Sequence, residues 1–223
     1  MRNCIFSLPI ILTSFFAIAQ ETKMGFGFAY MYAPQWDKAI QTYNFSRPFL
    51  EKKQPLFGFG YNISATHLFS SQNRMKHGCS FSGSFFESRA KNENLNNILR
   101  LGLLKPAYVM HFSNPDRTSG IYAELGVSLA ISVLSRKVNG SLFEYNTDRF
   151  RAYGLGGEIA CKSGYRFASK SKYSFSPFIA MTYAPYLFSQ NTEVVINQTQ
   201  GLATEKWTPI LVAIFGLSFH FSK

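Results

Sequence analysis

The stretch GIYAELGVSLAISVLS, residues 120–135, has a different chemistry on each set of alternate residues. The second set is made mainly of Gly, Ser and Ala with one charge, Glu124. A half-buried strand of a soluble protein also has a period of two, but it is usually about five or six residues long and carries charges on its wet face. This stretch is too long and its second face too uncharged for that interpretation. The first set is entirely aliphatic: Ile121, Ala123, Leu125, Val127, Leu129, Ile131 and Val133.

The same alternation recurs along the chain and predicts eight strands. The fourth stretch is the least regular, because its leucines up to Leu103 share one parity and the large residues from Tyr108 onward share the other. We expect a bulge at Lys105-Pro106 to re-phase that strand. An even number of strands is what a closed up-and-down barrel requires. The eight stretches are 23–33, 56–69, 77–87, 98–112, 120–135, 151–167, 173–187 and 207–221.

The connections between these stretches alternate in length, as they do in bacterial outer-membrane barrels, which have long loops outside and short turns inside. A lipocalin-type soluble barrel holds its large apolar side chains inside and its charges outside, whereas here the small residues fit the inside. We therefore predict an all-β, eight-stranded antiparallel up-and-down transmembrane β-barrel, closed because open edges leave unpaired backbone groups in hydrocarbon. The predicted long or polar loops are 34–55, 88–97, 136–150 and 188–206, and the short turns are SSQNRMKH, SNPDRTSG and ASKSK.

The first 19 residues predict a signal peptide, with cleavage after Ala19 and the barrel domain in residues 20–223. A short positive start is followed by an apolar run and by the small-x-small sequence Ala17-Ile18-Ala19. The apolar run is shorter than the roughly 18 to 20 residues of a spanning helix, and Pro9 interrupts it. We therefore expect export to the outer membrane of a Gram-negative cell.

Charge and aromatic content both favour contact with lipid. Removing residues 1–19 takes away Arg2 and no acidic residue, which leaves 22 basic against 12 acidic residues. A basic excess suits anionic lipid headgroups, and an exported chain is not expected to meet nucleic acid. Aromatic residues make up 17% of the chain and are expected in girdles at both membrane interfaces. The expected outer-rim rings are Tyr30, Tyr32, Phe57 and Phe59, and the inner-rim rings are Phe69, Phe112, Phe167, Tyr173, Phe175 and Phe221.

With its signal sequence, its eight alternating stretches and the terminal GLSFHF of residues 216–221, the chain resembles the small outer-membrane barrels of the OmpA and OmpX type. The resemblance implies a monomer that is inserted by the outer-membrane assembly machinery. Known members of that architecture include adhesins, membrane-integrity proteins, secretion accessories of the PorT kind and a few enzymes, so the fold alone leaves the function open.

One stretch also resembles the PagL-type lipid A deacylases. His111-Phe112-Ser113 followed by Glu124 matches their His-x-Ser pair and later Glu, and the resemblance implies Ser113 as nucleophile, His111 as base and Glu124 as its orienter. The predicted topology places His111 and Ser113 at the periplasmic end, away from the outer leaflet, and His-x-Ser recurs at residues 220–222. We therefore expect no enzyme. No catalytic residue, cofactor or metal site is predicted, since the four histidines lack metal-ligand spacing.

Charged residues on the small-residue face are expected to pair inside the narrow barrel, giving a plug and not a pore. The expected participants are Glu124, Glu158, Lys23, Arg100, Lys162 and Arg166.

Loop 34–55 is either a contact surface or a cover for the barrel mouth, and the sequence leaves both open. Its aromatic and basic residues are Trp36, Tyr43, Phe45, Phe49, Lys52 and Lys53. We thus expect a non-enzymatic barrel with a structural or loop-mediated role. Its expected partners are outer-membrane lipids and lipopolysaccharide, the insertion machinery and an extracellular ligand.

Overall fold

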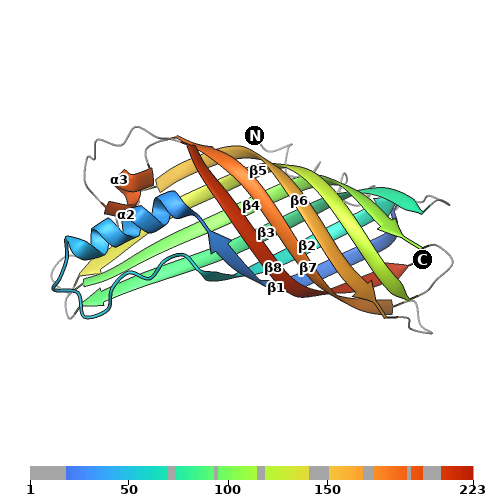
Figure 1. The fold of residues 1–223 in the computed structure, drawn as a ribbon, viewed down its shortest axis with the longest axis horizontal. Helices are drawn as coiled ribbons and strands as arrows, with labels where there is room; N and C mark the ends of the chain where they lie inside the picture. Colours follow the sequence, from blue (N-terminus) through green and yellow to red (C-terminus); the bar gives the residue numbers. More distant parts are fainter. Residues whose placement is uncertain are drawn as a thin grey trace, which may run out of the picture.

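A computed structural model describes residues 19–69, 74–92, 95–114, 119–140, 151–167, 173–189, 192–197 and 207–222. The described chain forms a closed barrel in which eight antiparallel strands follow each other in sequence order, and β8 pairs back onto β1 (Figure 1). The predicted fold class is confirmed. The strands are β1 Ala19–Tyr32, β2 Phe59–Phe69, β3 Met75–Asn92, β4 Leu95–Ser113, β5 Gly120–Gly140, β6 Arg151–Arg166, β7 Tyr173–Phe188 and β8 Trp207–Ser222.

The two ends of the barrel differ. At one end Glu21 of β1 pairs with Ser222 of β8, and the connections from β2 to β3, β4 to β5 and β6 to β7 are short. In outer-membrane barrels this is the periplasmic side, so we name it the inner end. Two helices lie at the opposite, outer end: α2 (Pro34–Phe45) and α3 (Thr192–Asn197) (Figure 1). The predicted signal peptide lies outside the described residues except for Ala19, where β1 begins.

At the outer end β3, β4 and β5 extend beyond the predicted strands. β3 and β4 pair as far as Asn92 and Leu95, and β5 continues to Gly140, so the predicted loop 88–97 and the start of loop 136–150 are wrong. Polar residues of that segment, which suggest a loop in the sequence, are buried and hydrogen-bonded in the structure. Gln54 donates to Ser88 Oγ at 2.6 Å, and Asn97 donates to Gln54 Oε1 at 2.8 Å.

The bulge predicted in β4 is absent. β4 keeps one register with β3 through Lys105 and Pro106, and Leu103, Lys105 and His111 all lie buried on the same parity. Large apolar residues change parity in the sequence because the barrel interior changes character. Its outer half is apolar beneath α2, and its inner half is polar. The same change occurs along β8, where Ile210 and His220 share the inward face.

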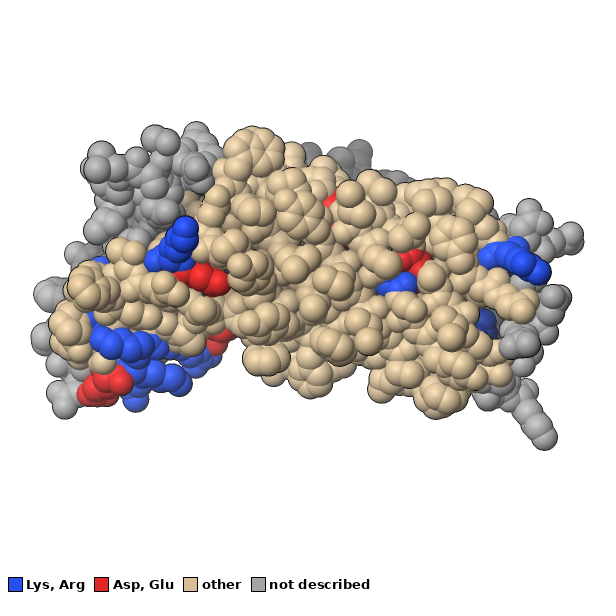
Figure 2. All heavy atoms as spheres, in the orientation of Figure 1, with Lys and Arg blue, Asp and Glu red and all other residues tan. Residues whose placement is uncertain are grey.

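The outward face is apolar, as predicted. Leu129 in the opening stretch is 52% exposed, whereas Ser132 on the other parity is completely buried. Figure 2 shows a broad, largely uncharged zone across the middle of the barrel, with Lys and Arg toward both ends and most of them at the outer end. The predicted rim rings Tyr30 and Phe59 are exposed. The prediction of Phe57 as a rim ring is wrong, because Phe57 is 2% exposed and packs against Trp36 of α2. Cys79 on β3 and Cys161 on β6 are both free, with two strands between them.

Candidate functional site

Helix α2 closes the outer mouth of the barrel. Pro34 occupies the first turn, where its missing N–H costs nothing. The helix buries Trp36, Ile40 and Tyr43, each at most 1% exposed. The Trp36 ring lies 5.5 Å from the Phe188 ring, and its Nε1 donates to Thr192 Oγ1 of α3 at 3.0 Å. Two interpretations of loop 34–55 were open, a contact surface and a cover for the barrel mouth. For the buried face of α2, the structure supports the cover.

The seal continues below the helix as an apolar layer contributed by the strands. One buried cation crosses it. Arg136 is 3% exposed; it donates to Asn97 Oδ1 at 2.6 Å and to the Ile196 carbonyl, and it lies 4.9 Å from the Tyr43 ring centroid. It thereby ties β5 to α2 and α3. The sequence analysis missed Arg136, although its parity continues the inward face of the opening stretch. The strand residues of the layer include Leu99, Leu101, Leu103, Leu134, Tyr186, Phe188, Ile210 and Val212.

Two ion networks fill the lumen below this layer. Lys105 lies 2.6 Å from Glu158, with side chains 1% and 4% exposed, and also donates to Thr182 Oγ1 at 2.9 Å. Closer to the inner end, Glu124 accepts from Lys23 at 2.7 Å and lies 3.5 Å from Lys162. Buried charges are stable when paired and hydrogen-bonded in this way.

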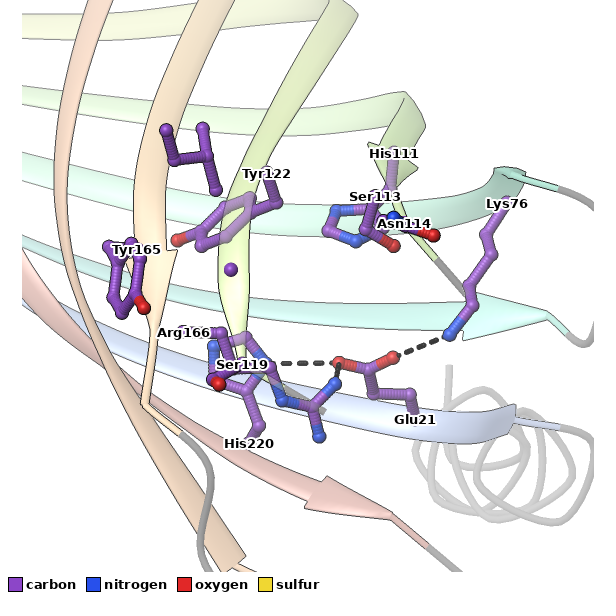
Figure 3. A pocket seen from close by; sticks show the side chains of 12 residues that line it. Glu21, Lys76, His111, Ser113, Asn114, Ser119, Tyr122, Tyr165, Arg166 and His220 are labelled. Carbon is purple, nitrogen blue, oxygen red and sulfur yellow. Dashed lines mark hydrogen bonds and ion pairs between the residues drawn. The ribbon is translucent and has the colours of Figure 1, made fainter. Parts of the chain in front are cut away.

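A third network lies at the inner end around Glu21 (Figure 3). Its carboxylate accepts from His220 Nδ1 at 2.9 Å, from Lys76 at 3.0 Å and from Arg166 at 3.3 Å. Glu21 is 4% exposed. The Glu21 side chain thus joins β1 to three other strands, β3, β6 and β8.

Predicted and observed ion pairs agree in part. Glu124 pairs with Lys23 and Lys162 as expected. The partner of Glu158 is Lys105, which the sequence analysis assigned to a bulge, and Arg166 binds the unpredicted Glu21. The prediction that Arg100 is a lumen charge is wrong. It lies 43% exposed and pairs with Glu87 at 2.8 Å.

The structure brings together parts of the deacylase-like set. His111 Nδ1 lies 3.0 Å from Glu124, and Ser113 lines the same inner-end cavity as His111. However, Nδ1 also lies 2.9 Å from the Lys23 ammonium, which can donate hydrogen bonds but cannot accept them. If Nδ1 accepts from Lys23, a neutral His111 carries its proton on Nε2. A catalytic base needs the opposite tautomer, with Nδ1–H on the carboxylate and Nε2 free to take a proton.

The remaining lumen is narrow. A Cβ built on Gly216 would lie 2.7 Å from Cζ of Phe178, so only glycine fits beside that ring. Lys162 lies 4.2 Å from the same ring. A cavity of about 80 Å³ remains between the two lumen networks, and a larger one of about 400 Å³ opens at the inner end.

The outer end carries an exposed basic and aromatic surface, which we name the outer patch: Phe45, Phe49, Lys52 and Lys53. Phe45 is 90% exposed and Phe49 60%. Lys53 donates to the Arg47 carbonyl at 3.0 Å, which holds the segment after α2 in a compact loop. Phe45 and Lys53 also border a shallow hollow with Gln41, Asn44 and Pro48.

The barrel therefore combines a closed sheet, an apolar exterior and a polar lumen. Closure leaves no sheet edge facing hydrocarbon, and the exterior presents a largely apolar, lipid-compatible surface at mid-height. The fold is that of a small outer-membrane barrel. Neither described helix is long and apolar enough to cross a membrane. Within the described residues, no group of three or more His, Cys, Asp or Glu could hold a metal ion.

Three solved structures align with this chain over about nine-tenths of its length. Neisserial surface protein A aligns with a TM-score of 0.48 and 8% identity over 91% of this chain and 96% of its own. Ail, the attachment invasion locus protein of Yersinia pestis, aligns with a TM-score of 0.41 and 9% identity over 92% of this chain and 100% of its own. The outer membrane protease OmpT from Escherichia coli aligns with a TM-score of 0.45 and 7% identity over 92% of this chain and 94% of its own. No family model and no curated protein matches the sequence.

Proposed function

We propose that this outer-membrane barrel is a non-enzymatic binding protein whose outer patch contacts the phosphate-bearing headgroup region of lipopolysaccharide. One observation carries the proposal. Helix α2 turns its apolar face, with Trp36 and Ile40, into the barrel. Phe45, Phe49, Lys52 and Lys53 are all exposed, and Phe45 and Lys53 border the same hollow. Exposed rings beside cations are suited to recognising anionic partners.

Two further observations support this function over its alternatives. The sealed outer half, with Trp36 and Arg136 at its centre, argues against a conducting pore. The contact of Lys23 with His111 Nδ1 argues against a serine hydrolase, and the set lies at the inner end, far from outer-leaflet lipid. Basic excess over the whole chain favours an anionic partner.

The outer patch can be tested by removing its two exposed rings. We expect Phe45→Ser/Phe49→Ser to weaken binding of the folded barrel to immobilised lipopolysaccharide about tenfold, because each ring contributes apolar contact at the interface. Surface plasmon resonance measures the effect. Lys52→Gln/Lys53→Gln should flatten the dependence of binding on salt, since exposed charges are screened over about 8 to 10 Å.

The matched control removes two exposed rings from the inner rim. Tyr165 and Phe167 are each 42% exposed, and Tyr165→Ser/Phe167→Ser should bind lipopolysaccharide within twofold of the wild type. Equal loss in both double variants, or none in the outer-patch variant, would contradict the proposal.

The absence of deacylase activity gives a separate expectation. Mass spectrometry of lipid A should show the same acyl pattern with and without expression of the wild-type barrel, because the Lys23 ammonium lies 2.9 Å from His111 Nδ1, the atom that a catalytic base needs to donate to its carboxylate. The matched variant is Ser113→Ala. An acyl chain lost with the wild type and retained with Ser113→Ala would identify an enzyme and overturn the non-enzymatic role.

A further inference from the structure

The inner end contains a charged cavity that the proposed function does not use. It has a volume of about 400 Å³ and is bordered by the ends of β1, β3, β4, β5, β6 and β8 (Figure 3). Glu21 is the carboxylate among its described lining residues, and Lys76 and Arg166 lie on either side of that carboxylate. One negative charge therefore faces two permanent positive charges.

These two cations retain donor capacity after binding Glu21. The Lys76 ammonium has three protons and makes one described bond, to Glu21 Oε2. The Arg166 guanidinium has five N–H groups; its Nε donates to Ser174 Oγ at 2.9 Å and its NH1 to Glu21. Their side chains are 27% and 29% exposed, so the remaining N–H groups are accessible from the cavity. Hydroxyl groups of Ser113 and Ser119 line the same space.

A second hollow adjoins the cavity on the lipid-facing side of the barrel wall. This hollow, also of about 400 Å³, shares Ser113, Asn114, Ile121 and Tyr122 with the first and is also bordered by Arg74 and Phe112. Phe112 and Ile121 face outward and are 36% and 73% exposed. A cationic mouth and an apolar membrane rim thus meet at the paired ends of β4 and β5.

We propose that this inner-end cavity binds the phosphate group of a phospholipid from the inner leaflet. The phosphate accepts hydrogen bonds from Lys76 and Arg166, and the acyl chains lie against Phe112 and Ile121. Phosphate oxygens are the acceptors that Arg and Lys bind best in charge-assisted bonds. Basic pockets at the edge of a membrane protein hold lipid headgroups by the same chemistry. The position at the inner leaflet makes this site independent of the outer patch.

Native mass spectrometry can test the site on the full barrel released from a nonionic detergent. With phosphatidylglycerol added, we expect one lipid per wild-type barrel and at least tenfold lower occupancy in Lys76→Gln/Arg166→Gln. Ser119→Asp, which adds a negative charge to the cavity and leaves the Glu21 network intact, should lower occupancy similarly. The heat-modified gel shift confirms that each variant is folded.

The chain offers a closely matched control at its outer end. Arg89 and Arg100 flank Glu87 as Lys76 and Arg166 flank Glu21, so Arg89→Gln/Arg100→Gln removes the same charges elsewhere. This variant should keep its lipid. Equal loss in the control, or full occupancy in Ser119→Asp, would overturn the site.

A second arm of the experiment separates the two sources of phosphate. Inorganic phosphate alone should compete for the site only at concentrations far above those of the lipid, because it lacks the contacts with Phe112 and Ile121. Tight binding of inorganic phosphate without binding of phosphatidylglycerol would show a free-phosphate site and overturn the assignment to lipid.

Discussion

Replacing Lys105 by Met is expected to lower the free energy of unfolding by about 3 to 5 kcal/mol, the usual cost of leaving one partner of a buried ion pair without the other. Lys105 and Glu158 are 2.6 Å apart and almost inaccessible to solvent. The truncated pair leaves a carboxylate in the lumen whose remaining described contact is a 3.4 Å bond from Ser128. Urea unfolding in lipid vesicles, followed by tryptophan fluorescence, measures the loss.

Two further variants test whether loss of the ion pair itself causes the loss of stability. Lys105→Met/Glu158→Met should recover most of the stability, because two apolar side chains of similar volume replace the whole pair. Arg100→Met, which removes a cation from the partly exposed pair with Glu87, should cost only about 0 to 1 kcal/mol. If the double variant is as unstable as Lys105→Met, the cost comes from packing, and the ion pair is not the cause.

The lipid-facing surface was predictable from the sequence because it depends on local periodicity. Side chains on a strand alternate between its two faces, so a run such as residues 120–135 shows which residues share a face without knowledge of the neighbours. Leu129 and Ser132 lie on the faces that this pattern indicates. The number of strands and their antiparallel order follow from the same pattern repeated eight times.

The interior was predictable only in part because its contacts join distant segments. Lys23 and Glu124 are 101 positions apart, so only the closed barrel brings them together. The inward face of β4 changes from apolar Leu103 to polar Lys105 and His111 without a break in register. In the sequence, that change looks like a shift of the apolar residues from one parity to the other. Phe57 looked like a rim aromatic because nothing in its own stretch shows that Trp36 packs 5.8 Å from it.

Placing an arginine at Leu129 is expected to cost about 2 to 4 kcal/mol of barrel stability, the penalty for a cation on the lipid face at mid-membrane. Leu129 is 52% exposed on the outward face of β5, and its partner on β6 is Gly157, which has no side chain to shield the new charge. Urea unfolding in lipid vesicles and the heat-modified gel shift report the change.

Depth, and not loss of an apolar side chain, is the proposed cause, and Ala123 provides the comparison. It lies on the same face of β5 near the inner end, where it pairs with Phe112 and Ser163. Ala123→Arg should cost only about 0 to 1 kcal/mol, because the arginine can extend to headgroup phosphates. If both variants lose the same stability, or if the wild-type protein is soluble without detergent, the outward face of β5 does not lie in a membrane.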